Sequence, residues 1–188
     1  MVAPSAIVVI GASLGGTRAL QAVLPALPAG FPLPIAVVLH RSADSEAGLG
    51  SALQQDCRLT VVEAEDKQEI ERGHVYLAPA GYHLLIEGGH CALSIEEPVN
   101  FALPSIDVLF ESAADSCGER VVGVVLTGNS SDGAEGLATI KRHGGLVIVQ
   151  DPATAEGTIM PAAAIAATKV DEILPLIEIG PFLARLAQ

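Results

Sequence analysis

Apolar and polar residues alternate in blocks along the chain. Short continuous apolar runs are typical of buried strands, and they occur at residues 6–10, 34–39, 61–65, 121–126 and 146–150. Segments whose apolar residues recur at helical spacing separate or follow these runs, at residues 16–26, 46–55, 105–115, 132–142, 161–168 and 173–186. Because strands and helices alternate, the pattern predicts an α/β fold with a doubly wound, mostly parallel sheet.

The segment around residues 70–100 departs from this alternation. Two short apolar runs, 74–78 and 83–86, are joined by P-A-G-Y, and a third run at 91–95 follows E-G-G-H. Short strands joined by glycine-containing turns are typical of hairpins. We therefore expect 74–78 and 83–86 to pair, and the segment to form a small antiparallel addition to the sheet. No interdomain linker is evident, so a single domain over residues 1–188 is expected.

Composition narrows the class of protein. Half of the residues are hydrophobic but only 3% are aromatic, so the core must consist of Val, Ile, Leu and Ala, as in strands buried on both faces. The net charge is −12 and the ten Lys and Arg residues are scattered. Nucleic acids and anionic membrane surfaces bind clustered basic residues, so neither is expected as a partner.

Location and redox state follow from two further features. No apolar run approaches the roughly 20 residues that a membrane-spanning helix needs, so no membrane insertion is expected. Three cysteines, Cys57, Cys91 and Cys117, are widely spaced. An odd number without a C-x-x-C motif predicts reduced core thiols in a cytoplasmic protein. No spacing of His, Cys, Asp or Glu suggests a metal site, so no metal is expected.

Chemically capable side chains follow three of the predicted strands. The first strand leads into G-A-S-L-G-G with Ser13, the second ends at His40, and 121–126 leads into T-G-N-S-S-D-G with Asp132. In open α/β sheets, ligands bind beyond the carboxyl ends of the strands. A serine on a sharp strand-to-helix turn can act as a nucleophile when a histidine base and an orienting acid are near. We therefore interpret Ser13, His40 and Asp132 as a candidate catalytic set.

Each of these residues also has a simpler interpretation. The glycine-rich turn could bind a dinucleotide in an oxidoreductase, but G-x-G-x-x-G needs glycine where Ser13 stands and an acidic residue where His40 stands. No cofactor is therefore expected. Taken alone, Ser13 could cap a turn, His40 could be an ordinary residue at a strand end, and Asp132 could be the N-cap of the helix that follows it.

The ordered motifs IGASLGG, VVLH, GHVYLAP, PSIDVLF and VVLTGNSSDGAEG resemble the catalytic domain of the chemotaxis protein-glutamate methylesterases, CheB, over roughly residues 6–170. The resemblance implies a three-layer α/β/α fold. It also implies hydrolysis of γ-glutamyl methyl esters on the cytoplasmic helices of methylated chemoreceptors, with release of methanol. Many members also deamidate receptor glutamines.

The resemblance assigns roles residue by residue. It places the nucleophile at Ser13, the base at His40 and the orienting acid at Asp132. It suggests that the backbone N–H of Asn129 helps to hold the oxyanion, and we expect a second donor at Leu14, directly after the nucleophile.

The chain departs from the family pattern at three places. Leu14 stands where the family usually has Thr or Ser. Phe101, Ala102 and Leu103 replace basic and histidine residues, so the rim before P-S-I-D is expected to be apolar. The 188 residues leave no room for the receiver domain that family members typically carry. We therefore expect either a stand-alone esterase that is regulated in another way, which is the favoured alternative, or a piece excised from a longer protein. A catalytically weak module that binds receptors or a kinase is the alternative, although the intact serine, histidine and aspartate argue against it.

Overall fold

A parallel sheet organises the computed structural model, which describes residues 7–41 and 48–186. Within these residues the sheet has seven strands in the order β3-β4-β2-β1-β7-β8-β9. Their bounds are β1 Ile7–Ala12, β2 Ile35–Leu39, β3 Thr60–Glu63, β4 His74–Leu77, β7 Val121–Val125, β8 Leu146–Gln150 and β9 Glu172–Leu174. A separate antiparallel pair consists of β5 His83–Glu87 and β6 His90–Ser94. The doubly wound α/β fold and its small antiparallel addition are thus confirmed.

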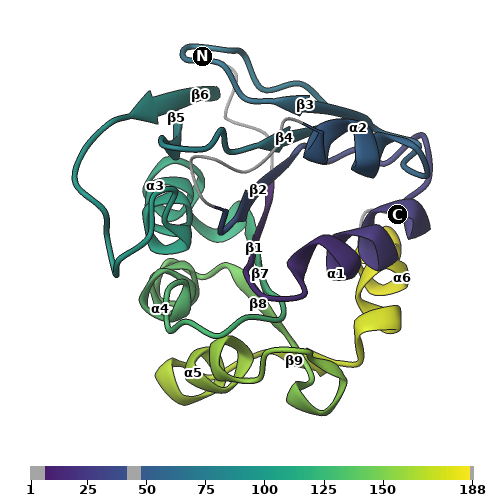
Figure 1. Ribbon diagram of the computed structural model, residues 1–188, viewed down its shortest axis with the longest axis vertical. Helices are drawn as coiled ribbons and strands as arrows, with labels where there is room; N and C mark the ends of the chain where they lie inside the picture. Colours follow the sequence, from purple (N-terminus) through teal and green to yellow (C-terminus); the bar gives the residue numbers. More distant parts are fainter. Residues whose placement is uncertain (1–6, 42–47, 187–188) are drawn as a thin grey trace.

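Helices cover both faces of the parallel sheet. The α-helices are α1 Gly16–Val23, α2 Leu49–Gln54, α3 Ile106–Cys117, α4 Ala134–Arg142, α5 Ile159–Ala167 and α6 Leu176–Leu186. Short 3₁₀ turns occur at η1 Leu24–Ala26, η2 Gly118–Arg120 and η3 Pro152–Thr154. Helices α3, α4 and α5 lie on one side of the sheet, and α1 and α6 lie on the other (Figure 1). The arrangement is the expected three-layer α/β/α architecture.

Strand β1 shows why the sequence forms this sandwich. Its side chains alternate between two buried clusters: Ile7 and Val9 belong to the cluster with α3 and α4, and Val8 and Ile10 belong to the cluster with α1 and α6. All residues of β1 are buried. A strand that is covered on both faces has to be apolar throughout, which is the pattern the sequence shows here.

The hairpin expected between 74–78 and 83–86 is wrong. Strand β4 lies inside the parallel sheet, where Val75 pairs with Ile35 of β2 on one side and with Val61 of β3 on the other. Strand β5 pairs instead with β6, in antiparallel register. The P-A-G-Y segment therefore connects two sheets. The apolar run of β4 reflects burial in the interior of the larger sheet, which local turn residues do not reveal.

The C-terminal segment 173–186 contains a strand that the sequence analysis did not predict. Residues Glu172–Leu174 form β9, which pairs with β8 at the edge of the sheet, and α6 begins only at Leu176. Pro175 separates the two elements. A proline disfavours helical backbone at the residue before it, so Leu174 remains extended and the helix starts after the proline.

Helices α3 and α4 pack closely because Gly136 has no side chain. A Cβ atom at this position would lie 2.6 Å from the Cβ of Phe110 and 3.0 Å from the Cα of Asp107. The first contact is closer than packed atoms tolerate, and the second, which is with backbone, is tighter than most packed contacts. The position of α4 against the first turns of α3 therefore depends on this glycine.

We expect Gly136→Ala to lower the free energy of unfolding by about 1–3 kcal/mol, because the added methyl group forces the two helices apart. Gly50→Ala in α2 is the matched control, since its Cβ would meet only the Cδ1 of Leu77, at 3.8 Å. There the higher helix propensity of alanine should stabilise the protein by up to about 1 kcal/mol. Urea denaturation followed by circular dichroism measures both, and equal stability of the two variants would contradict the close packing.

Candidate active site

The carboxyl ends of β1, β2 and β7 meet at the centre of the sheet because β1 pairs with both of the others. Hydrogen bonds continue past the strands: the His40 N–H donates to the Ala12 carbonyl at 3.0 Å, and the Ser13 N–H donates to the Thr127 carbonyl at 2.9 Å. The loops that carry the three predicted residues are thereby held side by side. This edge lies where the chain winds in opposite directions from β1, which is where open α/β sheets place their sites.

Ser13 occupies a tight turn between β1 and α1. The Gly16 N–H donates to the Ser13 carbonyl at 2.8 Å, and Gly15 has a φ of 77°, in the left-handed region that favours glycine. On the opposite side, a Cβ atom at Gly128 would lie 2.8 Å from the Cβ of Ser13. The glycines on both sides therefore allow two backbone segments to approach this serine.

A short hydrogen bond joins the side chains of His40 and Asp132. The Nε2 of His40 lies 2.7 Å from Oδ2 of Asp132, whose side chain is completely buried. An ionised carboxylate can only accept, so Nε2 carries the proton of this bond and Nδ1 is the basic nitrogen. Ser13 and His40 line a common cavity of about 280 Å³. Within residues 7–41 and 48–186, no hydrogen bond joins Ser13 to His40.

Three further donors hold the carboxylate of Asp132. They are the Ser105 hydroxyl at 2.8 Å, the Ile106 N–H at 2.7 Å and the Asp107 N–H at 3.1 Å. Burial by itself would raise the pKa of Asp132, but the hydrogen bond from His40 and these three bonds outweigh it, so the pKa is lowered. Asp132 therefore remains ionised at neutral pH, at the positive N-terminus of α3.

Asp107 makes the reciprocal contact with α4. Its Oδ1 accepts hydrogen bonds from the N–H groups of Gly133 at 2.9 Å and Gly136 at 2.7 Å. The interpretation of Asp132 as the N-cap of the helix that follows it is therefore wrong: Asp132 caps α3, and Asp107 caps α4. Burial raises the pKa of Asp107 to about 6, and the charge of Asp132 adds to the rise.

Ser105 and Asp107 are site residues that the sequence analysis missed. The sequence analysis predicts a helix over residues 105–115 and assigns no catalytic role to this segment, and α3 does begin directly after Ser105. The hydroxyl of Ser105, however, donates to Asp132 and does not cap its own helix. The signal was a serine and an aspartate two residues apart at a helix N-terminus, but nothing in the sequence indicates that they contact Asp132.

Thr127 joins the loops on the other side of Ser13. Its hydroxyl donates to the Leu14 carbonyl at 2.9 Å and accepts from the Gly157 N–H at 2.7 Å. Within residues 7–41 and 48–186, hydrogen bonds engage the backbone N–H groups of Ser13 and Gly16 but not those of Leu14 or Asn129. Leu14 and Asn129 therefore have N–H groups available next to the serine, as an oxyanion site requires.

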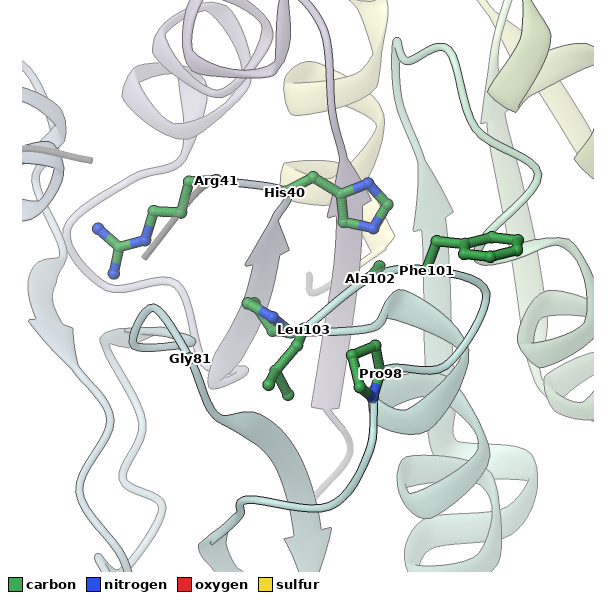
Figure 2. A pocket seen from close by; sticks show the side chains of 8 residues that line it. His40, Arg41, Gly81, Pro98, Phe101, Ala102 and Leu103 are labelled. Atoms are coloured by element: carbon green, nitrogen blue, oxygen red, sulfur yellow. The ribbon is translucent and has the colours of Figure 1, made fainter. Parts of the chain in front are cut away.

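A second cavity, of about 530 Å³, opens beside His40 (Figure 2). Arg41 and Gly81 line one part of it, and Pro98 together with residues 101–104 lines another. Arg41 extends away from the His40 ring in Figure 2, and its guanidinium donates to Glu63 at 2.5 Å and to the Ala78 carbonyl at 3.1 Å. The rim formed by Phe101, Ala102 and Leu103 therefore borders the candidate active site.

Metal sites and membrane-spanning helices are both missing from the described residues. Across 7–41 and 48–186, no three His, Cys, Asp or Glu residues are grouped so that they could hold a metal ion. None of the helices in these ranges has the length and apolar character to cross a membrane.

Comparison with known proteins identifies close relatives. A putative protein-glutamate methylesterase/protein-glutamine glutaminase of Leptospira interrogans is 49% identical over 182 residues, covering 96% of this chain and 94% of the relative. Protein-glutamate methylesterase/protein-glutamine glutaminase 2 of Anaeromyxobacter dehalogenans is 47% identical and covers 97% of this chain. The chain spans only 53% of that second relative.

Structure and family comparisons agree with these relatives. The crystal structure of the Thermotoga maritima CheB methylesterase catalytic domain superposes with a TM-score of 0.92 at 36% identity, covering 97% of this chain and 98% of that one. The model of the CheB methylesterase family matches residues 8–183. The chain therefore belongs to the CheB methylesterase family.

Proposed function

We propose that this protein hydrolyses γ-glutamyl methyl esters on methylated chemoreceptors and releases methanol, and that it deamidates receptor glutamines. The single observation that carries the proposal is the bond between His40 Nε2 and Asp132 Oδ2 beside the cavity that Ser13 also lines. The relatives support the proposal, since both carry the names of these two activities. The chain is then a carboxylic ester hydrolase that works in the cytoplasm, where the receptor helices lie.

The geometry supports acyl transfer through Ser13. Nδ1 of His40 takes the proton of the serine hydroxyl while Oγ attacks the ester carbonyl carbon. Backbone N–H groups of Leu14 and Asn129 hold the oxyanion. His40 then gives its proton to the departing methoxide, which leaves as methanol. A water molecule, deprotonated by His40, attacks the acyl-enzyme, and the glutamate carboxylate and free serine result.

The same steps apply to a glutamine side chain. The carbonyl carbon of the amide is attacked in the same way, and His40 protonates the leaving nitrogen so that ammonia departs. Asp132 acts in both reactions by holding the Nε2–H tautomer of His40 and by stabilising the imidazolium that forms. Because four donors fix its carboxylate, the acid is positioned before substrate arrives.

The alternative functions are less well supported. A dinucleotide loop would have to accommodate pyrophosphate where the Ser13 side chain stands, and His40 occupies the position of the ribose-binding acid. A binding module without turnover would not need an ionised, completely buried aspartate bonded to a histidine. A buried charge loses its hydration, and this loss costs stability unless hydrogen-bond partners replace the lost water.

The nucleophile is tested by Ser13→Ala. We expect methanol release from a methylated receptor cytoplasmic fragment to fall by about 10⁴-fold or more, because the acyl-enzyme cannot form. The thermal unfolding midpoint should remain close to that of the wild type, since the substitution removes one partly exposed hydroxyl. A variant that keeps most of the activity would show that another residue is the nucleophile.

The orienting acid is tested by Asp132→Asn beside Ser105→Ala. The first substitution places an amide donor among four donors, so we expect about 10⁴-fold lower kcat and a loss of about 3–5 kcal/mol in the free energy of unfolding at pH 7. The second removes one donor, and a smaller loss of about 1.5–3 kcal/mol is expected. Asp56→Asn, at an exposed position, is the control and should change neither quantity.

The stability difference between wild type and Asp132→Asn should also depend on pH. Because the folded protein lowers the pKa of Asp132, the ionised carboxylate stabilises the fold above its unfolded pKa of about 3.9. That contribution is lost as the pH falls through the lower folded value. Urea denaturation should therefore show a gap that is largest at pH 7 and narrows toward pH 3. A constant gap would contradict the assigned ionisation.

A further inference from the structure

Phe101 stands at the tip of a tight turn formed by Val99, Asn100, Phe101 and Ala102. Val99 and Ala102 exchange two backbone hydrogen bonds, of 3.1 and 2.9 Å. The two central residues both have positive φ, 51° at Asn100 and 62° at Phe101. Turns of this kind favour Asn and Gly, and Asn100 fits that preference. Phe101 does not, because an aromatic L-residue is strained in the left-handed region.

Burial does not offset this strain. Phe101 is fully exposed, whereas Ala102 beside it is buried. The fold thus gains no packing from the ring, although large apolar side chains are normally the most valuable groups to bury. A strained backbone that carries an exposed aromatic ring indicates a contact outside the fold.

A side-chain hydrogen bond connects the turn to the candidate active site. The amide of Asn100 donates to Oδ2 of Asp107 at 2.6 Å. The other oxygen of Asp107 accepts from the N–H groups of Gly133, which directly follows Asp132, and of Gly136. A segment that docks on the turn is therefore held in a fixed position relative to the residues that orient His40.

The ring lies where a protein substrate has to approach. Phe101 and His40 line the same cavity of about 530 Å³. In Figure 2 the ring points away from Leu103 and Gly81, so it projects from the rim and does not fill the cavity. Arg41, which also lines this cavity, is bonded to Glu63 and the Ala78 carbonyl. The part of the rim that is most exposed is therefore apolar.

We propose that Phe101 determines specificity by packing against an apolar side chain of the receptor segment next to the glutamyl ester. The inference rests on the esterase function proposed above and names the chemistry that its substrate must carry beside the ester. An exposed aromatic ring offers a large contact area with few rotatable bonds, which is why aromatic residues dominate binding energy at interfaces. The bound apolar side chain supplies the burial that Phe101 lacks in the free protein.

The test compares two substrates with Phe101→Asn. One is a methylated receptor cytoplasmic fragment, assayed by methanol release, and the other is p-nitrophenyl acetate, which has no flanking chain. We expect the ratio of kcat/KM for the fragment to that for the small ester to fall about 10-fold, mainly through KM. Asparagine tolerates the left-handed conformation, so the thermal midpoint should be equal to or above that of the wild type. Phe101→Leu should restore most of the ratio.

Ile95→Asn is the matched control, because Ile95 is also an exposed apolar residue of this segment but does not line the cavity. It should leave the ratio at its wild-type value. An unchanged ratio in Phe101→Asn, or an equal loss on both substrates, overturns the role of Phe101 while the esterase function stands. Wild-type protein that releases no methanol from the fragment overturns the proposed function, and the inference falls with it.

Discussion

Two buried carboxylates hold this site together, because each of them caps the N-terminus of the helix next to the other. Asp132, which precedes α4, accepts the first N–H groups of α3, and Asp107, in the first turn of α3, accepts N–H groups at the start of α4. Burying one negative charge is costly, and burying two close together is more so. The cost is met because each carboxylate satisfies donors that would otherwise lack partners at a helix end. Neither helix can be capped in this way without the other in place.

This reciprocal capping of α3 and α4 determines where the candidate active site lies. The parallel sheet brings Ser13 and His40 to the same edge through the register of β1 with β2 and β7. It does not by itself bring an acid to His40, because Asp132 lies several residues beyond the end of β7. The N-terminus of α3 supplies the missing constraint: it attracts the carboxylate of Asp132 and leaves one of its oxygens directed at Nε2 of His40.

The sequence predicted the parts of this site that follow from strand order and failed where distant segments decide. Ser13 and His40 could be placed because the ends of neighbouring parallel strands share an edge, and Asp132 could be named because it follows the apolar run at 121–126. Asp107 could not be assigned a role, since a cap that comes from another helix has no sequence spacing. Strand β4 was assigned to a hairpin because nearby turn residues suggest local pairing, whereas its partners are β2 and β3.

The bond between His40 and Asp132 joins residues that are 92 positions apart. Closing so long a segment of chain is entropically unfavourable until many other contacts form. The bond can exist only when β1, β2 and β7 are in register and α3 has docked on α4. A nascent or partly unfolded chain therefore contains Ser13 and His40 without the bond that joins His40 to Asp132. Under the proposed mechanism, hydrolytic competence is in this way a property of the completed fold.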